Sequence, residues 1–266
     1  MDEGRYLLDN RAAGAGDRIA ALSALFDPTT FRHVDALGIT RGARCWEVGA
    51  GGPSVPRGLA ARVGPEGHVL ATDLEVSPAL AAAAGGALEV RRHDVTRDPP
   101  PRERGPFDLV HARLVLVHLP DRERALCAMI DVLRPGGWLL VEDADPALQP
   151  ASVIDAVDEE AALANRLRNG FRALLAERSV DLAYGRKLPR LLRAAGLLDV
   201  AADAYFPIAH PACAALEIAT VRMLRAQLVD RGLATAEEIE RHLANVAAGR
   251  LDLAQPPMIS AWGRRP

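Results

Sequence analysis

The sequence predicts an α/β fold in which a doubly wound, mostly parallel sheet has helices on both faces. Between residues 43 and 145, short apolar runs alternate with stretches whose apolar residues recur at helical spacing. Such alternation is typical of βαβ units, because parallel strands need a crossover connection. The first apolar run ends in the glycines Gly49 to Gly52, a turn at which a ligand can approach bare backbone.

Seven strands are predicted, most of them short apolar runs of the kind that a sheet buries on both faces. They lie at 44–49, 68–74, 88–94, 107–112, 137–142, 198–207 and 258–262. The helices between the first five strands are predicted at 54–63, 77–84 and 121–134. The sequence Arg134-Pro135-Gly136-Gly137 predicts a sharp helix stop before the fifth strand.

The rest of the chain is predicted to be mainly helical. Apolar residues from Ile19 to Phe26 repeat at helical spacing, and Asp27-Pro28 is expected to end that helix and start a segment reaching Leu37. Further helices are expected at 151–178, 186–195, 212–231 and 236–248. Thr235 is a good N-cap for the last of them.

These elements predict an organisation into a core and helical additions. The expected parts are an N-terminal helical lid at 1–42, a ligand-binding core at 43–145, an inserted cap helix at 146–185, core completion at 186–208 and 257–266, and a helical cap insertion at 209–256.

Composition argues against several classes of function. The length of 266 residues, with 49% hydrophobic and 25% charged residues, is ordinary for a globular protein with a full core. A net charge of −3 offers no strongly basic face for nucleic acid. The three cysteines are scattered, so we expect no disulfide framework and no metal site. The acidic N-terminus is no signal peptide and no apolar run is long enough to span a membrane, so we expect a cytoplasmic protein without a membrane partner.

Acidic residues recur at the ends of the predicted strands. Glu47 lies inside the first strand, two positions before Gly49. Asp73 ends the second strand, where a carboxylate can accept hydrogen bonds from ribose hydroxyls. Asp94 ends the third strand, where it can accept from an adenine amino group, and residues 107–113 would lie beside the same ligand. We therefore expect a cofactor rich in ribose hydroxyls and adenine edges.

With these residues the chain resembles the class I S-adenosylmethionine-dependent methyltransferases, nearest to the small-molecule methyltransferases of bacterial secondary metabolism. The resemblance runs through Glu47-Val48-Gly49-Ala50-Gly51, Asp73, Asp94, His118-Leu119-Pro120-Asp121 and Leu133-Arg134-Pro135-Gly136-Gly137, with Tyr6-Leu7-Leu8-Asp9-Asn10 and Ser260 to Arg265 at the two ends. It implies a Rossmann-like, mostly parallel seven-stranded sheet with an antiparallel final strand and a helical cap. It also implies S-adenosyl-L-methionine as cofactor and S-adenosyl-L-homocysteine as product.

The resemblance also implies roles for single residues. Gly49 and Gly51 would face the methionine part of the cofactor, Asp73 would hold the ribose, and Asp94 with Val95 the adenine. The expected cofactor-binding residues are Tyr6, Glu47, Gly49, Ala50, Gly51, Asp73, Leu74, Asp94, Val95, His111, Ala112 and Arg113.

One position departs from the family, whose turn usually reads GxGxG. Pro53 stands at the last glycine position here, and it suits the first turn of a helix. A nicotinamide-binding domain is the nearest competing interpretation, but it gives no reason for acids at Glu47 and Asp94.

Methyl transfer from a sulfonium is a direct displacement, so the protein must align the acceptor, and a base with a pKa near neutrality assists some acceptors. The candidate catalytic residues are His118, Asp143 and His111, each with a structural role as the alternative. Because side chains alternate along a strand, only one of Glu142 and Asp143 should face the ligand, and Asp143 is preferred. His210 is a further histidine that could reach the ligand.

The resemblance predicts a methyltransferase that modifies oxygen, nitrogen or carbon of a small, hydrophobic or aromatic metabolite. An alternative is an enzyme that binds the same cofactor and catalyses a cyclisation or rearrangement without methyl transfer. A third is a non-catalytic cofactor-binding or partner-binding protein. The arginine-rich outer helices leave a homodimer open.

Overall fold

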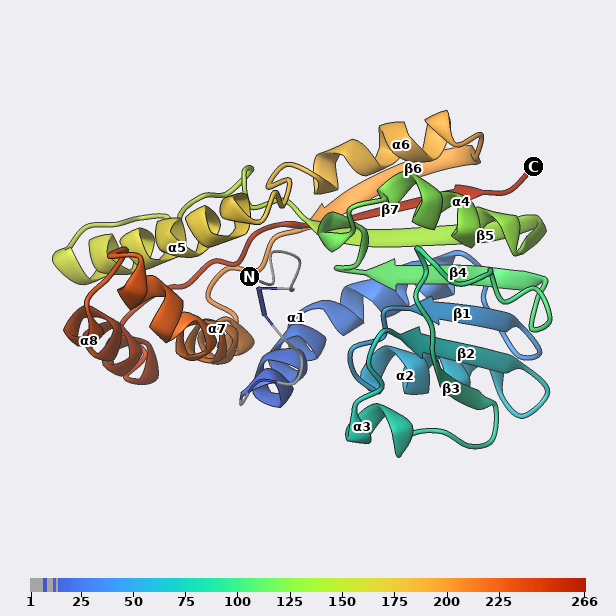
Figure 1. The fold of residues 1–266 in the computed structure, drawn as a ribbon, viewed down its shortest axis with the longest axis horizontal. Helices are drawn as coiled ribbons and strands as arrows, with labels where there is room; N and C mark the ends of the chain where they lie inside the picture. The colour runs from blue at the N-terminus through green and yellow to red at the C-terminus, as the bar shows by residue number, and fades with distance from the viewer. Residues whose placement is uncertain (1–6, 9–11, 13) are drawn as a thin grey trace. The chain divides into compact units, whose positions relative to one another are not determined.

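A computed structural model describes residues 7, 8, 12 and 14–266 of the chain. Its seven strands form one sheet in the order β3-β2-β1-β4-β5-β7-β6 (Figure 1). The strands are β1 (Arg44–Val48), β2 (His68–Asp73), β3 (Leu88–Arg92), β4 (Phe107–Arg113), β5 (Leu133–Ala144), β6 (Leu198–Tyr205) and β7 (Met258–Arg264). Each overlaps a strand predicted from the sequence.

Strand directions also agree with the prediction. β1 pairs in parallel with β2 and β4, β2 with β3, and β4 with β5. The last strand, β7, pairs antiparallel with β5. The α/β class, the mostly parallel seven-stranded sheet and the antiparallel final strand are therefore confirmed.

The helices connect and flank the strands. In chain order they are α1 (Ala15–Ala36), α2 (Ser54–Val63), α3 (Pro78–Ala81), the short 3₁₀ turn η1 (Leu116–His118), α4 (Arg122–Asp131), α5 (Glu159–Glu177), η2 (Gly185–Lys187), α6 (Leu188–Ala194), α7 (Pro211–Asp230) and α8 (Ala236–Ala247). In the described part of the chain, no helix is both long and apolar enough to cross a bilayer.

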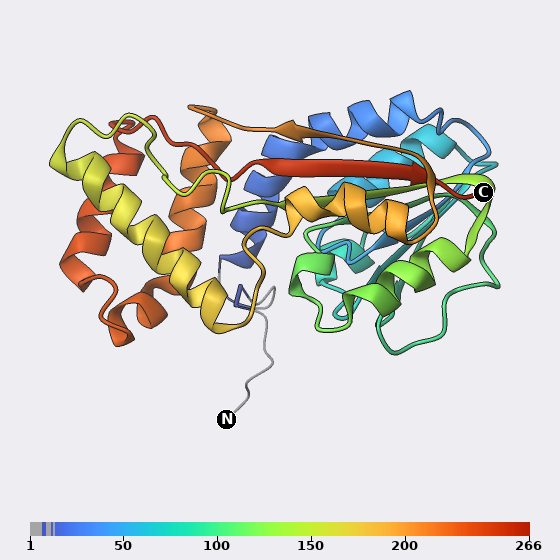
Figure 2. The ribbon, with the colours of Figure 1, turned by 90° about the horizontal axis from the view of Figure 1, so that it is seen from above.

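The chain divides into two compact units. The sheet unit comprises residues 27–144, 184–204 and 258–266, and the helical unit comprises the described residues up to 26 together with 145–183 and 205–257. Within the sheet unit, α2 covers one face of the sheet, and α4 and α6 cover the other (Figure 2). The core under α2 joins Leu59 and Val63 to Cys45, Val69 and Leu109 of the strands. On the other face the Trp46 ring stacks on Phe107.

The helical unit is built from α5, α7 and α8 around a cluster of buried leucines and valines. Thr235 caps α8 as predicted: its side chain accepts from the backbone N–H of Glu238, and Glu238 reaches back to the backbone of Thr235, which completes a capping box. Pairing of orphan N–H groups in this way fixes where the helix begins.

The predicted break within the first helix was wrong. The expected break at Asp27-Pro28 is absent, and α1 continues through Pro28. Proline inside a helix costs about 3 kcal/mol, but Leu25 before it and Val34 after it are both buried, and their packing outweighs that cost.

The helix predicted from residue 151 begins only at Glu159. The backbone N–H groups of Ser152 and Val153 donate instead to the side chain of Asn165, at 2.7 and 2.8 Å. Asp158 then caps the helix by accepting from Ala161. The polar side chain of Asn165 thus holds the preceding segment in a non-helical conformation.

The fifth strand also begins earlier than predicted. α4 ends at Asp131, and β5 starts at Leu133 and includes the expected stop sequence. The pairing of β4 with β5 shifts register between Phe107 and Leu109, which accommodates the prolyl-glycine stretch as an irregularity within the strand.

Candidate functional site

The glycine turn follows β1 at the carboxyl edge of the sheet, where open α/β sheets bind ligands. Gly49 and Gly51 have φ angles of 64° and 62°, in the left-handed region. A methyl group on Gly49 would also collide with the side chain of Val115, in the segment that follows β4. The turn therefore needs glycine at residue 49 for both its backbone conformation and its packing.

Asp73, at the end of β2, is tied directly to this turn. Its Oδ2 accepts from the N–H of Gly51 at 2.8 Å, and its Oδ1 accepts from the N–H of Glu75 at 3.0 Å. Burial raises the pKa of Asp73, and the two backbone donors oppose that rise. A carboxylate offers about four lone-pair sites, so Asp73 can still accept hydrogen bonds from a diol. The neighbouring Leu74 is an exposed apolar side chain beside this carboxylate.

Asp94 lies just beyond β3, next to the end of β2. The N–H of His93 donates to the backbone oxygen of Asp73, which brings the two strand ends together. Oδ1 of Asp94 accepts from the backbone N–H and the hydroxyl of Thr96, at 2.9 and 2.6 Å. Burial acts to raise the pKa of Asp94, but these hydrogen bonds outweigh it and the net shift is downward. Asp94 is therefore an ionised acceptor beside the buried Val95.

Glu47 has a partner that the sequence did not reveal. Its Oε2 lies 2.5 Å from Nδ1 of His111 on β4, and Nε2 of His111 lies 3.2 Å from Oε2 of Glu142 on β5. All three side chains are buried. The imidazole of His111 thus bridges two carboxylates beneath the carboxyl ends of three neighbouring strands.

Glu142 collects further donors from α1 and β7. The hydroxyls of Thr30 and Ser260 both donate to it, the second at 2.6 Å. Nδ1 of His33 lies 3.6 Å from its Oε1, and Nε2 of His33 lies 2.9 Å from Oδ1 of Asp203 on β6. A continuous buried polar cluster therefore underlies this edge of the sheet.

Arg113 ends β4 beside this cluster. Its guanidinium donates to the Thr30 hydroxyl at 3.0 Å and to Asp27 at 2.8 Å, both on α1. The next residue, Leu114, has a φ of 58°, and its N–H donates to the backbone oxygen of Glu142. A non-glycine residue in the left-handed region at this edge is the kind of strain that clusters at functional sites.

The three candidate catalytic residues have different surroundings. His111 is fully buried with a carboxylate at each ring nitrogen. His118 is half-buried at the end of η1. Asp143 is fully buried, and among the described residues neither of its carboxylate oxygens has a hydrogen-bond partner. His210, in the helical unit, caps α7 by accepting from the N–H of Ala212.

Burial raises the pKa of Asp143 well above its usual range. The rise is only partly opposed by the Arg122 guanidinium and by the dipole of the Val117 N–H, which lies outside hydrogen-bonding geometry. Glu142 and Asp143 lie on opposite faces of β5, as strand alternation requires, but both are buried.

The sheet unit brings together most of the residues expected to bind the cofactor. Around the carboxyl ends of β1 to β4 lie Glu47, Gly49, Ala50, Gly51, Asp73, Leu74, Asp94, Val95, His111, Ala112 and Arg113. Tyr6 lies outside the described residues. The sequence alone does not reveal Thr30, His33, Asp203 and Ser260 as members of this cluster, since only strand pairing and the course of α1 bring them to this edge.

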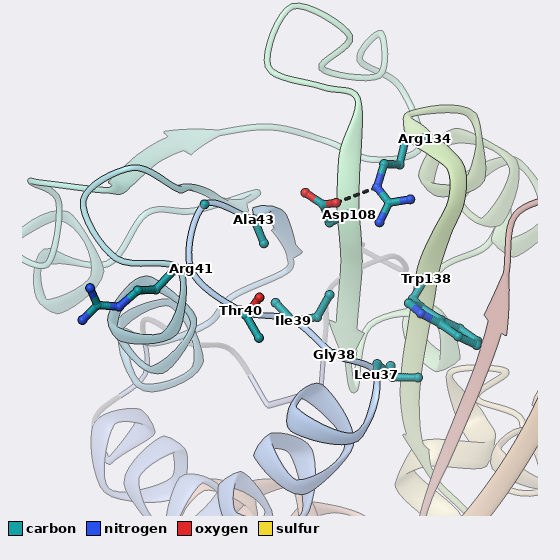
Figure 3. A pocket seen from close by; sticks show the side chains of 10 residues that line it. Leu37, Gly38, Ile39, Thr40, Arg41, Ala43, Asp108, Arg134 and Trp138 are labelled. Atoms are coloured by element: carbon teal, nitrogen blue, oxygen red, sulfur yellow. Dashed lines mark hydrogen bonds and ion pairs between the residues drawn. The ribbon is translucent and has the colours of Figure 1, made fainter.

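A hollow of about 370 Å³ opens at the opposite edge of the sheet. It is lined by the loop from Leu37 to Ala43 and by Asp108, Arg134 and Trp138 (Figure 3). Asp108 and Arg134 face each other there and form an ion pair of 2.6 Å. Because these residues lie at the amino ends of β1, β4 and β5, the hollow is separate from the ligand edge defined by the glycine turn.

Comparison with known proteins agrees with this geometry. The profile of a family described as "Methyltransferase domain" matches residues 17–202. Methyltransferase str2 of Strobilurus tenacellus is 35% identical over 136 residues, which cover 51% of this chain and 46% of that protein. The ubiquinone biosynthesis O-methyltransferase of Marinobacter nauticus is 28% identical over 123 residues, 43% of this chain and 50% of that protein. The chain thus spans about half the length of these relatives.

Solved structures share the fold. The phosphoethanolamine N-methyltransferase 2 of Haemonchus contortus, in complex with S-adenosyl-L-methionine, superposes with a TM-score of 0.59 at 15% identity, over 98% of this chain and 60% of that one. A sarcosine dimethylglycine methyltransferase described from Galdieria sulphuraria gives 0.54 at 13% identity, over 99% and 93%. Because the family profile covers most of the sequence, the chain belongs to the methyltransferase domain family.

Proposed function

We propose that the protein is an S-adenosylmethionine-dependent methyltransferase that modifies oxygen, nitrogen or carbon of a small, hydrophobic or aromatic metabolite. The observation that carries the proposal is the bond between the Gly51 N–H and Asp73, which fixes a carboxylate against a glycine turn at the ligand edge. Names of relatives that refer to ubiquinone biosynthesis support a small-molecule acceptor.

The described residues fit the chemical groups of this cofactor. Asp73 suits the ribose hydroxyls, the exposed Leu74 suits the face of an adenine ring, and Asp94 suits an adenine amino group. S-adenosylmethionine, when bound, supplies a methyl group activated by a sulfonium. The residues that we propose to hold it are the twelve named from the sequence, with Tyr6 resting on the resemblance alone.

The sheet unit has to position the methyl acceptor. For an acceptor that loses a proton on methylation, it also has to supply a base that takes up this proton. Asp143 suits that second task best of the three candidates, because its carboxyl accepts no hydrogen bond from the described residues and its raised pKa makes it a stronger base when ionised. His118 is the second choice, half-buried at the same end of the sheet. Both nitrogens of His111 already contact carboxylates, so it suits a positioning role instead.

The direct test is to incubate the protein with S-adenosylmethionine and a panel of phenolic, quinone and amine acceptors, and to follow S-adenosylhomocysteine and products by mass spectrometry. The proposal predicts an acceptor that gains one methyl group, with equal release of S-adenosylhomocysteine. A product isomeric with its substrate and no S-adenosylhomocysteine would instead support the cyclisation or rearrangement alternative. Asp143→Asn should lower the turnover number for acceptors that must lose a proton, with cofactor affinity unchanged.

A further inference from the structure

A row of acids and imidazoles alternates across the sheet unit. It runs from Asp203 on β6 through His33 on α1, Glu142 on β5 and His111 on β4 to Glu47 on β1. The successive contacts are 2.9, 3.6, 3.2 and 2.5 Å. Asp203 is partly exposed, with 36% of its side-chain surface accessible, and the other four side chains are buried. The row thus connects the surface to the strand that leads into the glycine turn.

The two carboxylates that flank His111, those of Glu47 and Glu142, determine its charge. Both ring nitrogens face carboxylate oxygens, and only an imidazolium can donate from both nitrogens at once. Burial alone would lower the pKa of His111, but Glu47 and Glu142 outweigh it and raise it to about 9. His111 is therefore a buried cation at neutral pH.

Glu142 is the group that stabilises this cation in the core. Burial would raise the pKa of Glu142, but the hydrogen bond with His111 and the His33 imidazole 3.6 Å away outweigh burial and hold that pKa well below its usual range. The hydroxyls of Thr30 and Ser260 add two more donors to the same carboxylate. An ionised, fully hydrogen-bonded Glu142 is the anchor against which His111 keeps its proton.

Glu47 contacts the other nitrogen of the imidazole, so the charge of His111 affects the pKa of Glu47. Burial raises the pKa of Glu47, the negative charge of Glu142 adds to the rise, and the net shift is upward. His111 is the largest opposing influence, followed by Arg113. The contact with His111 uses Oε2, so Oε1 can accept from a positively charged group of a ligand at the glycine turn. The ionisation of Glu47 thus depends on a neighbour whose own charge depends on Glu142.

We propose that Glu142 is a positioning residue for cofactor binding, which acts through His111 to orient Glu47 beneath the glycine turn and to favour its ionised form. The proposal rests on the proposed function, because the ligand in question is the cofactor. The charged groups that face the row are Arg113 on β4, which is paired with Asp27 of α1, and Arg32 of α1, which donates to Asp203. None of these replaces Glu142 as the partner of His111 Nε2.

The experiment is calorimetric titration with S-adenosylhomocysteine from about pH 6 to about pH 9.5, on wild type, Glu142→Gln and Glu142→Asp. Glu142→Gln keeps the shape and one acceptor oxygen but removes the charge. We expect it to bind about tenfold more weakly at pH 8, because His111 then loses its proton at lower pH. Its affinity should also begin to fall at a lower pH than that of wild type, and Glu142→Asp should restore much of the wild-type profile.

The matched control is Glu217→Gln, which removes an equally buried glutamate in the helical unit. It should lower thermal stability without moving the pH profile of cofactor affinity. Equal affinities and parallel pH profiles for wild type and Glu142→Gln would overturn the proposal and leave the proposed function intact. Absence of binding by wild type at every pH would instead reject the proposed function.

Nuclear magnetic resonance of the wild-type histidines covers the case in which Glu142→Gln does not fold. The proposal predicts that His111 keeps protons on both ring nitrogens at pH 7.5 (about one unit above the ordinary histidine pKa), and that these signals shift when S-adenosylhomocysteine binds. A neutral His111, or signals indifferent to a ligand that does bind, would overturn it.

Discussion

Glu47 and His111 are direct neighbours in the pairing of β1 with β4, and their side chains meet at 2.5 Å between Oε2 and Nδ1. An acid that the sequence marks as part of a cofactor turn is thus half of a buried ion pair. Glu142 contacts the other nitrogen of the imidazole. Titratable side chains from β1, β4 and β5 are therefore in direct contact just below the ligand edge. The proposed cofactor site therefore has an internal electrostatic support as well as its backbone turn.

The ion pair of His111 predicts a loss of stability at alkaline pH. Its pKa is about 9 in the folded protein and 6.5 ordinarily, so its contribution to the free energy of unfolding is complete below pH 6.5 and disappears as the pH rises through about 9. Urea unfolding across this range should show a decline for wild type. His111→Gln should be less stable at pH 6 and should lack this decline; parallel curves for the two proteins would contradict the assignment of the cation.

The packing of Gly49 against Val115 predicts a steric effect of substitution, and Gly38 provides a control without this contact. Gly49→Ala places a side chain at positive φ and against Val115, whereas Gly38→Ala, also at positive φ, meets nothing within 4 Å. We expect Gly38→Ala to lower the free energy of unfolding by about 1–2 kcal/mol from the left-handed conformation. Gly49→Ala should cost about 1–3 kcal/mol more from the collision and should also weaken cofactor binding. Equal losses in the two variants would show that the packing of the turn against Val115 is unimportant.

Asp143 is a buried carboxyl without a hydrogen-bond partner in the described part of the chain, so it should cost stability. Its pKa is raised well above the usual 3.8, which means that wild type loses stability as the pH rises from 3.8 toward the raised value. Asp143→Asn cannot ionise, so the difference in unfolding free energy should move in favour of the variant as the pH rises. A difference that stays constant with pH would show that Asp143 is paired in solution.

The lowered pKa of Glu217 predicts that the helical unit loses stability at acid pH. Burial would raise its pKa, but Arg168 and His242, at 3.1 and 3.0 Å, outweigh burial and lower it to about 2. Its contribution to stability is therefore present above pH 4.5 and is lost as the pH falls through about 2. Glu217→Gln should be destabilised by about 3–5 kcal/mol at pH 7, because the buried Arg168 loses its carboxylate partner.

The exposed pair of Arg225 and Glu240 serves as the control for Glu217. Glu240→Gln should change stability by less than about 1 kcal/mol. A similar, small effect of both substitutions would mean that water reaches Arg168 and that the cluster is not buried in solution.

The sheet could be predicted from the sequence because each strand is a short apolar run with glycine, proline or acidic residues at its ends. The carboxylates at the carboxyl ends of β1, β2 and β3 could be predicted for the same reason, since each is local to its own strand. The break expected at Pro28 failed because a local preference was outweighed by burial of Leu25 and Val34, and burial depends on the whole fold.

The acid–imidazole row lay beyond local patterns. Glu47 meets His111 and Glu142 meets Ser260 only through strand registers that join residues 64 and 118 positions apart in sequence. His33 and Asp203 join from α1 and β6, 170 positions apart in sequence. A polar residue inside an apolar strand was the available signal, and it identified Glu47 and His111 without revealing that they are partners.

The carboxyl edge around the glycine turn should bind S-adenosylmethionine, and Asp73 is the residue at which this binding is best tested. Calorimetric titration with S-adenosylmethionine and S-adenosylhomocysteine should be run on wild type, on Asp73→Ala, and on Asp131→Ala, which removes an exposed aspartate paired with Arg102. We expect micromolar binding by wild type and by Asp131→Ala, and its loss in Asp73→Ala while the protein remains folded. Neither heat nor a thermal shift for folded wild type with either ligand would contradict the assignment of this edge as the cofactor site.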